Sequence, residues 1–202
     1  MRSIKRLLKS AYFFCLRNIP ALRPLHDSLE TASPILPRML FMQKVLGFNR
    51  RVPWPVHFTS KVSGSEFIQI GVAGSPGFMG GCYIFAKQNS PITIGDYCVI
   101  SANVCLAGYN HDIYDYTQFS TKGGIRIGHY CWIGMSASVM PGVVLGDHTV
   151  VAAGSVVTQS FAEGYCVLGG VPARVIKRLD AARCVEHRTR HEFIGFRRVV
   201  RP

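Results

Sequence analysis

A short polar and aromatic segment near the middle of the chain contains side chains that could do chemistry. It begins Asn110-His111-Asp112, and two tyrosines and a second aspartate follow within the next four residues. A histidine side chain has an ordinary pKa near 6.5, so at neutral pH most histidine side chains are uncharged and able to accept a proton. His111 is therefore a candidate general base. The alternative is that it only satisfies hydrogen bonds within a loop.

A repeat of six residues defines the elements that must position this segment. From Ile127 to Val157, an aliphatic residue recurs at every sixth position without a break. Neither a helix, with period 3.6, nor an ordinary strand, with period 2, requires this spacing. Four positions after each of the first five aliphatic residues stands a small or β-branched one: Cys131, Ala137, Val143, Thr149 and Ser155. Such repeats build a parallel β-helix.

The spacing predicts the geometry of the coil. Six residues make one short strand and a tight corner, so three sides close a triangular coil of about eighteen residues stacked at roughly 4.8 Å. The aliphatic residue points inward, and the small residue points inward near the corner. Glycine follows three of the aliphatic residues, as in Gly134, and we expect it to adopt backbone angles that a side chain would resist. The periodicity leaves the hand of the coil open.

The candidate base lies where the repeat is interrupted. Ile94, Ile100 and Leu106 keep the same spacing, but Leu106 and Ile127 are 21 residues apart where six would suffice. About fifteen residues, approximately 108–124, therefore leave the prism as a loop that contains His111. Loops on rigid scaffolds are where binding and catalytic residues concentrate.

These patterns divide the chain into three parts of an all-β protein. Residues 1–55 form a basic, partly helical extension, with helices expected at 4–19 and roughly 27–47 between prolines. Residues 56–172 form the repeat region, whose coils run from about Lys61 to Leu168. The turn at 169–172 ends the prism. Residues 173–202 are expected to form a short helix and a basic tail.

Composition narrows the class of protein. The chain of 202 residues is 48% hydrophobic and 17% charged, which is typical of a globular domain with a real core. It has an odd number of cysteines, seven, and lacks a Cys-x-x-Cys motif, while Cys98 and Cys131 fall on inward positions. We therefore expect a reducing, cytoplasmic location rather than a disulfide framework or a zinc ribbon. The sequence contains no eighteen-residue apolar run, and the apolar stretch 11–16 is too short for a typical signal peptide.

The net charge of +12 is concentrated at the ends of the chain. Residues 1–51 carry ten Lys or Arg against two acids, residues 174–202 carry nine against three, and residues 52–173 carry four against six. The first twenty residues also alternate basic with large apolar side chains, which predicts peripheral contact with the inner face of an anionic membrane. The alternative is that this helix packs on the prism or on a neighbouring subunit. Nucleic acid is not an expected partner, because no recognised module accompanies the charge.

Several motifs carry a resemblance to a known family. They are the six-residue repeat, the loop that begins near a histidine, Cys131-Trp132-Ile133-Gly134, Pro141-Gly142-Val143, residues 154–158 (GSVVT) and residues 170–176 (GVPARVI). Over about residues 65–178 the chain resembles the hexapeptide-repeat acyltransferases, and within them the galactoside and maltose acetyltransferases and the O-acetyltransferases of bacterial polysaccharide clusters. The motifs are specific for the fold and for a CoA thioester donor, and weakly specific for the acceptor.

The resemblance implies a left-handed parallel β-helix, a homotrimer with active sites between neighbouring prisms, and no bound metal. It implies transfer of an acetyl group from acetyl-CoA to a hydroxyl of a saccharide, as in a surface polysaccharide or its precursor. His111 stands where the family places its general base, with either a carbonyl group or Asp112 fixing its tautomer. The acceptor would contact Asn110, Asp112 and Tyr83, although the asparagine with which sugar-acetylating relatives grip the acceptor is not evident in the stretch 80–83.

The resemblance also assigns residues to the donor. The positions that match the family's acyl-CoA site are Trp132, Gly134, Met135, Ala153, Thr158, Gln159, Arg174 and Lys177. Relatives often have serine where Met135 stands and lysine where Gln159 stands, so one hydrogen bond and one charge of the family's site are missing here. Arg174 and Lys177 suit phosphate recognition; a solvated basic face is the alternative.

Three other functions remain alternatives. Within the class, the acceptor could be an amino sugar or another small molecule. A metalloenzyme resembling the gamma-class carbonic anhydrases would need His111, His129 and His148 as ligands, but His129 is expected to stack with Asp147 and His148 with Tyr130, one position out of register. A non-catalytic trimeric scaffold would leave the loop of His111 unexplained.

Overall fold

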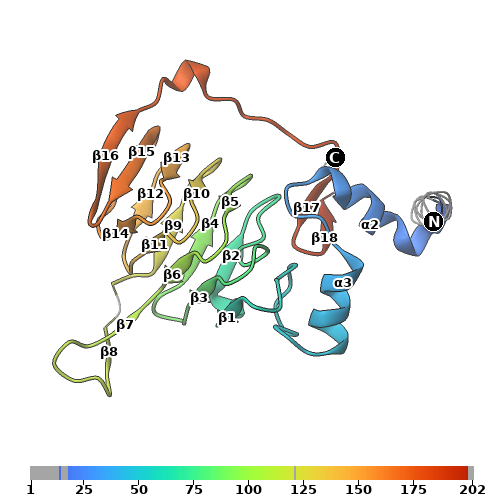
Figure 1. The fold of residues 1–202 in the computed structure, drawn as a ribbon, viewed down its shortest axis with the longest axis horizontal. Coiled ribbons are helices and arrows are strands. Elements are labelled where there is room, and N and C mark those ends of the chain that lie inside the picture. Colours follow the sequence, from blue (N-terminus) through green and yellow to red (C-terminus); the bar gives the residue numbers. More distant parts are fainter. Residues whose placement is uncertain (1–13, 15–17, 121, 200–202) are drawn as a thin grey trace, which may run out of the picture.

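In the computed structural model of the chain, which describes Phe14 and residues 18–120 and 122–199, short strands stack into a three-sided prism (Figure 1). One face contains, in order, β1 (Lys61–Ser63), β3 (Tyr83–Phe85), β6 (Cys105–Ala107), β11 (Ser138–Val139) and β14 (Val156–Val157). The second contains β5 (Val99–Ile100), β10 (Trp132–Ile133), β13 (Thr149–Val151), β15 (Cys166–Gly170) and β16 (Ala173–Arg178). The third contains β2 (Ile68–Ile70), β4 (Ile92–Ile94), β9 (Ile125–Ile127) and β12 (Val144–Leu145).

The strand register confirms the predicted coil. Trp132 pairs in parallel with Val150, which lies 18 residues later in the chain. Across the loop, Ile133 pairs with Ile100, which lies 33 residues earlier. The 15 residues of difference are those that leave the prism, as the interrupted repeat predicts.

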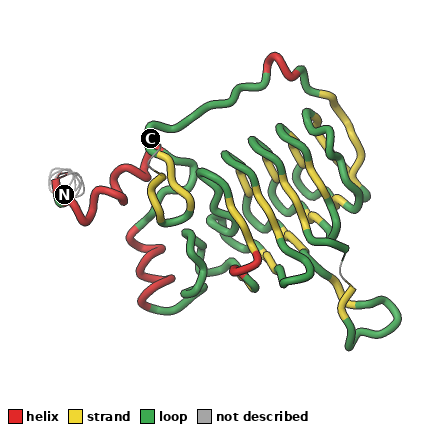
Figure 2. The backbone as a smooth tube through the Cα atoms, turned by 180° about the vertical axis from the view of Figure 1, so that it is seen from behind, coloured by secondary structure: helices red, strands yellow, loops and turns green. Residues whose placement is uncertain are grey.

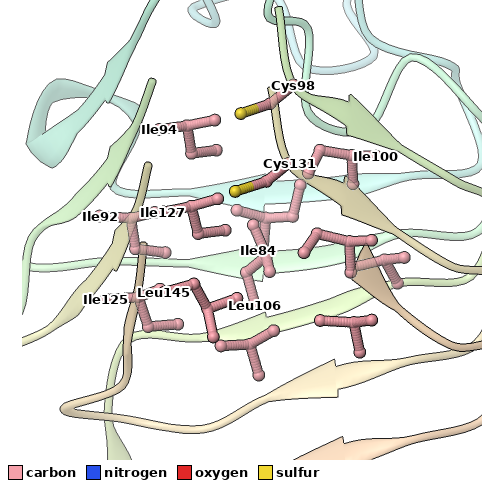
Figure 3. Close-up of a cluster of buried hydrophobic side chains, with 14 of the residues drawn as sticks. Ile84, Ile92, Ile94, Cys98, Ile100, Leu106, Ile125, Ile127, Cys131 and Leu145 are labelled. Carbon is pink, nitrogen blue, oxygen red and sulfur yellow. The ribbon is translucent and has the colours of Figure 1, made fainter. Parts of the chain in front are cut away.

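The aliphatic residues of the repeat fill the prism, as expected. Ile133, Val139, Val151 and Val157 are completely buried, and Leu145 nearly so. Figure 3 shows buried side chains of the same core converging from all three faces, among them Ile100, Leu106 and Leu145, with Cys98 and Cys131 above one another near a corner. All six cysteines that the structure describes are free thiols.

The glycines of the repeat have a different role from the one expected. Gly95 and Gly134 do not have positive φ angles; residues two positions later do, with φ of 56° at Tyr97 and 58° at Ser136. A Cβ atom on Gly95 would lie 2.6 Å from the backbone carbon of Gly128, and one on Gly134 would lie 2.6 Å from the carbonyl oxygen of Val151. Close approach of the next coil, rather than an unusual backbone angle, therefore excludes a side chain at these positions.

Four aromatic rings form a ladder along one corner. Tyr97, Tyr130, His148 and Tyr165 follow one another with ring centroids 5.3, 5.1 and 5.0 Å apart. The predicted stacking of His148 with Tyr130 is confirmed, and the backbone N–H of His129 donates to Asp147 Oδ1 at 2.7 Å, as expected for coil neighbours. The ladder holds His148 buried between two rings.

The C-terminal segment differs from the prediction of a short helix. Residues 173–178 form strand β16, which pairs antiparallel with β15. The physical reason is that the last coil would otherwise leave the edge of β15 unpaired, and a β-branched stretch satisfies that edge better than a helix. After a single 3₁₀ turn, η5 (Ala181–Arg183), the tail runs back to the other end of the prism (Figures 1 and 2). There the hairpin of β17 (Glu192–Ile194) and β18 (Arg197–Val199) packs beside the first coils.

The N-terminal extension is a series of short helical turns followed by an extended segment. They are η1 (Pro20–Leu22), α2 (Arg23–Asp27), η2 (Ser28–Glu30), α3 (Pro37–Leu40) and the π-helical η3 (Phe41–Val45), with η4 (Ser65–Phe67) later in the chain. The buried amide of Gln43 ties η3 to the extended segment, donating to the carbonyls of Val52 and Trp54 and accepting from the N–H of Val56. None of the helices in the described part of the chain has the length and apolar character that a bilayer crossing requires. The predicted helix at 4–19 and its membrane contact fall almost wholly outside the described residues.

Candidate active site

The loop predicted at 108–124 is a hairpin that projects from the prism (Figures 1 and 2). Strand β7 (Asn110–His111) pairs antiparallel with β8 (Phe119–Ser120), so that Asn110 faces Ser120 and His111 faces Phe119. Lys87, in the preceding coil, holds the base of the hairpin. Its Nζ lies 4.3 Å from the ring centroid of Tyr109 and 4.1 Å from that of Phe119. These cation–π contacts join the hairpin to the rigid scaffold.

The hydrogen bond of His111 decides its tautomer. Nδ1 lies 2.7 Å from the carbonyl oxygen of Tyr116, within the same hairpin. A carbonyl oxygen only accepts, so Nδ1 must carry the proton and donate it. In the neutral ring Nε2 then has a free lone pair, and no hydrogen bond to it is found among the described residues. The ring is exposed and rests against Phe119, with centroids 4.7 Å apart. Of the two groups considered for orienting the ring, the structure selects a carbonyl group.

The two aspartates of the hairpin shape its turn. Asp112 Oδ1 accepts the backbone N–H groups of Tyr114 and Asp115, at 2.8 and 3.2 Å. Asp115 Oδ1 accepts from the hydroxyl and the backbone N–H of Thr117. These hydrogen bonds hold the pKa of the Asp115 carboxyl below its ordinary value. Both carboxylates are thus engaged locally, and Asp112, a predicted acceptor contact, does not line the pocket of His111.

A pocket of about 380 Å³ lies between the hairpin and the outer surface of the first face. Its lining includes three of the predicted site residues, Tyr83, Asn110 and His111, together with Lys61, Ser63, Ile84, Phe85, Tyr109 and Phe119. Aromatic rings follow one another along the wall, from Tyr83 to Phe85, Tyr109 and Phe119, with centroids 5.7, 5.2 and 5.2 Å apart. His111 continues this row. The pocket therefore places a proton acceptor at the end of an aromatic wall.

Thr158, predicted to bind the donor, lies close to the same hairpin. It lines an adjoining pocket of about 200 Å³ with Asn110, Ser120, Lys122, Met140 and Pro141. Gln159 follows it at the same end of the first face and is exposed. Asn110 borders both pockets, so it connects the surroundings of His111 to those of Thr158.

The other predicted donor residues lie elsewhere on the same chain. Trp132 is half exposed on the second face, where its indole Nε1 donates to Ser101 Oγ at 3.2 Å. Gly134, Met135 and Ala153 stand at the corner after that face; the N–H of Gly154 donates to the carbonyl oxygen of Met135. None of these residues lines the pocket of His111.

Arg174 and Lys177 belong to β16, at the far edge of the second face. Both are exposed, and the guanidinium of Arg174 donates to the neighbouring carbonyl oxygen of Ala173. Lys177 pairs with Val167, which follows Val150 and Trp132 at the same register position of successive strands of the second face. Within one chain, the predicted donor residues of the second face are therefore separated from the candidate base, which lies on the hairpin beside the first face.

Sequence reasoning missed most of the pocket wall. Phe85, Tyr109 and Phe119 are aromatic, but only the paired hairpin shows which rings meet. Lys61 and Lys87 were two of only four basic residues in the repeat region, and that scarcity was the one signal that could have singled them out.

The geometry does not unite the three histidines weighed as metal ligands. His111 lies on the hairpin, His129 lies at a coil corner and His148 lies inside the aromatic ladder. Across the described residues, no group of three or more His, Cys, Asp or Glu side chains could hold a metal ion.

Comparisons with known proteins identify the repeat. The family model described as "Bacterial transferase hexapeptide (six repeats)" matches residues 124–159, and the one described as "Hexapeptide repeat of succinyl-transferase" matches residues 80–107. These segments flank the hairpin on both sides.

Curated relatives match the central part of the chain. A galactoside O-acetyltransferase of Escherichia coli (strain K12) is 37% identical over 95 residues, which are 44% of this chain and 45% of that protein. A second protein of that strain, provisionally named a lipopolysaccharide biosynthesis O-acetyl transferase, is 30% identical over 110 residues, or 48% of this chain and 56% of that one. The chain thus spans about half the length of these curated relatives.

A solved structure of a galactoside acetyltransferase in complex with coenzyme A shares the fold. It superposes with a TM-score of 0.53 at 22% identity, over 89% of this chain and 83% of that one. Together with the parallel coils and the matched repeats, this likeness confirms the predicted left-handed parallel β-helix.

Proposed function

Because the chain belongs to the hexapeptide-repeat family, we propose that it is a CoA-dependent acyltransferase that moves an acetyl group from acetyl-CoA to a hydroxyl group of a saccharide. Three of the relatives described above support this proposal, since two are named O-acetyltransferases and one was solved with coenzyme A. The observation that carries the proposal is the state of His111: its Nδ1 proton is held by the Tyr116 carbonyl, which leaves Nε2 able to accept a proton beside a pocket.

The chemistry follows from this arrangement. An alcohol is a weak nucleophile at neutral pH, so His111 Nε2 takes the hydroxyl proton as the oxygen attacks the thioester carbonyl. A carbon–oxygen bond forms, the carbon–sulfur bond breaks, and the proton passes from Nε2 to the departing thiolate. The Tyr116 carbonyl stabilises the imidazolium that forms between these steps, because it accepts from Nδ1 throughout. A positioned base of this kind contributes on the order of 10²–10⁴-fold in rate.

We also propose a homotrimer, because the site is incomplete in one chain. The acceptor pocket and the base lie on the first face and the hairpin, whereas Trp132 and the exposed cations Arg174 and Lys177 lie on the second face. In a trimer, the second face of one subunit can lie against the hairpin of the next. Half-exposed Val99, Trp132 and Met135 suit burial in such an interface.

The donor would then be held by groups from both subunits. Thr158 lines the pocket that adjoins the pocket of His111 at Asn110, and Gln159 follows it in the chain, so both suit the part of the donor nearest the reaction. Arg174 and Lys177 suit its phosphates, because an exposed strand edge presents both side chains to solvent. The saccharide would be part of a surface polysaccharide or its precursor, in line with the second relative.

The proposal is tested by replacing His111 with asparagine. Asparagine keeps an N–H donor near the position of Nδ1, so the bond to the Tyr116 carbonyl can persist while the proton acceptor is lost. Release of the CoA thiol from acetyl-CoA in the presence of galactosides should fall by about 10²-fold or more. The melting temperature and the affinity for CoA should remain those of the unmodified protein.

A partly buried histidine outside the site provides the control. Nδ1 of His57 bonds to the hydroxyl and the backbone N–H of the neighbouring Thr59, and the ring does not line either pocket at the hairpin, so His57→Asn should retain full activity. Unchanged turnover in His111→Asn would refute the proposed role of His111. The absence of histidine-dependent thiol release with every saccharide offered would refute the proposed function.

A further inference from the structure

We infer that the pocket beside His111 takes an acceptor that carries an anionic group, a carboxylate or a phosphate, and that Lys61 is the residue that recognises it. This inference rests on the proposed function, because it names the class of acceptor for the same site. Lys61 and His111 line one pocket, from β1 of the first coil and from the hairpin respectively.

The distribution of charge in the repeat region supports this inference. Residues 52–173 contain only four basic residues, Lys61, Lys87, Lys122 and Arg126, against six acids. Three of the four gather at the hairpin: Lys61 lines the pocket, Lys87 lies against two of its rings, and Lys122 lines the adjoining pocket. A mildly acidic prism thus carries its positive charge at the candidate active site.

No acid offsets the charge within the pocket. The lining contains no Asp or Glu, and Lys61 forms no ion pair with any of the described residues. The two acids of the hairpin, Asp112 and Asp115, accept hydrogen bonds from their own turn instead. Lys61 therefore remains available to a ligand, whereas Lys87 is held between the rings of Tyr109 and Phe119.

The aromatic wall determines where the anionic group would lie. Lys61 Nζ lies over the ring of Tyr83, 5.5 Å from its centroid, at one end of the row of rings, and His111 continues the row at the other end. A saccharide can lay the C–H groups of its ring along such a wall while its polar groups reach the two ends. The reacting hydroxyl would then point to His111 and the acidic substituent to Lys61.

The test compares matched charged and uncharged saccharides in the absence of acetyl-CoA. Dissociation constants of the full chain are measured by NMR titration for a galacturonate trisaccharide, the galactose trisaccharide of the same linkage, galactose 6-phosphate and galactose. We expect at least one charged probe to bind about fivefold more tightly than its neutral counterpart. The carboxylate and phosphate probes distinguish the two sources of negative charge.

Three variants assign the effect to Lys61. Lys61→Gln should abolish the preference for the charged probe, and Lys61→Arg should retain it. Arg126→Gln removes a positive charge from the exposed surface of the third face, outside the pocket lining, and should change nothing. Affinity for CoA should be unchanged in all three.

Two results would overturn the inference. One is equal binding of charged and neutral probes by the unmodified protein; the other is a loss of CoA affinity in Lys61→Gln, which would assign this lysine to the donor. Because these measurements are of binding alone, they are separate from the thiol-release assay. Histidine-dependent transfer to neutral saccharides without any preference for acidic ones would leave the proposed function intact and reject this inference.

Discussion

The coils of the prism and the hairpin at 108–124 differ in burial, in periodicity and in strand pairing. Coil residues such as Leu106 and Ile133 are completely buried and repeat with a fixed period, whereas Ile113 and Tyr114 at the hairpin tip are 74% and 92% exposed. The coils are joined by parallel pairing to neighbours on both sides, whereas strands β7 and β8 of the hairpin form a two-stranded sheet of their own. The repeat thus provides a rigid support, and its interruption carries the histidine proposed as the general base.

The contrast predicts that stability and the proposed function can be separated in this chain. The hairpin joins the prism at Gly108 and Gly124, and cation–π contacts from Lys87 fix its base. Its own hydrogen bonds, from Asp112, Asp115 and the Tyr116 carbonyl, fix its tip. Changes in the coils should therefore affect the free energy of unfolding, and changes in the hairpin should affect catalysis.

Excision of the hairpin is expected to have the largest effect. Deleting residues 109–123 restores the six-residue spacing between Leu106 and Ile127, so the prism should still fold with its register intact. Activity should fall below detection, because the base and one wall of the acceptor pocket are lost. Circular dichroism and thiol release measure the two outcomes.

Deletion of residues 130–144, also fifteen residues, is the control, because it would break the register and should unfold the protein. If the variant that lacks residues 109–123 were unfolded, the hairpin would be part of the scaffold.

Core truncation should produce the opposite result. Leu106→Ala removes a completely buried side chain from the prism and should lower the free energy of unfolding by about 2–5 kcal/mol, measured by urea denaturation. The rate per folded molecule should change little. Ile113→Ala, at the exposed tip of the hairpin, should cost less than about 0.5 kcal/mol. Equal costs at the two positions would contradict the division into scaffold and hairpin.

Two substitutions at one corner should distinguish steric crowding between neighbouring coils from strain in the backbone. Gly134→Ala forces a methyl group against the carbonyl oxygen of Val151 in the next coil and should cost about 1–3 kcal/mol. Ser136→Gly relieves a residue at φ of 58°, so it should be neutral or stabilising by up to about 1 kcal/mol. Thermal denaturation of the two variants gives the comparison. If Ser136→Gly were the more damaging, the close approach of coils would not be the reason for glycine at the repeat position.

Replacement of Asp112 should have the smallest effect. In Asp112→Asn the remaining side-chain oxygen can still accept the N–H groups of Tyr114 and Asp115, and the Tyr116 carbonyl still orients His111. We expect thiol release within about threefold of the unmodified protein, since neutral hydrogen bonds contribute roughly 0.5–1.5 kcal/mol each. A loss as large as that of His111→Asn would show that Asp112, rather than the carbonyl, supports the base.

Much of the fold could be predicted, because each step of the repeat has a local cause. Aliphatic residues at every sixth position, small residues near the corner and the excess length between Leu106 and Ile127 predict the coils, their register and a loop at 108–124, which the structure shows to be a hairpin. Two expectations failed where the cause was not local. Positions 95 and 134 require glycine because the neighbouring coil approaches closely. Residues 173–178 form a strand because the last coil offers an unpaired edge.

The features of the candidate site also separate into those with a local cause in the sequence and those without one. The sequence by itself determined that a histidine would stand on a loop beside a β-helix, because residue spacing alone decides which residues a coil can accommodate. Only the tertiary structure decided which carbonyl holds the Nδ1 proton, which aromatic rings meet in the pocket wall and which lysines gather there. Those contacts join residues from separate coils and from the two strands of a hairpin, and no periodicity along the chain encodes their meeting in space.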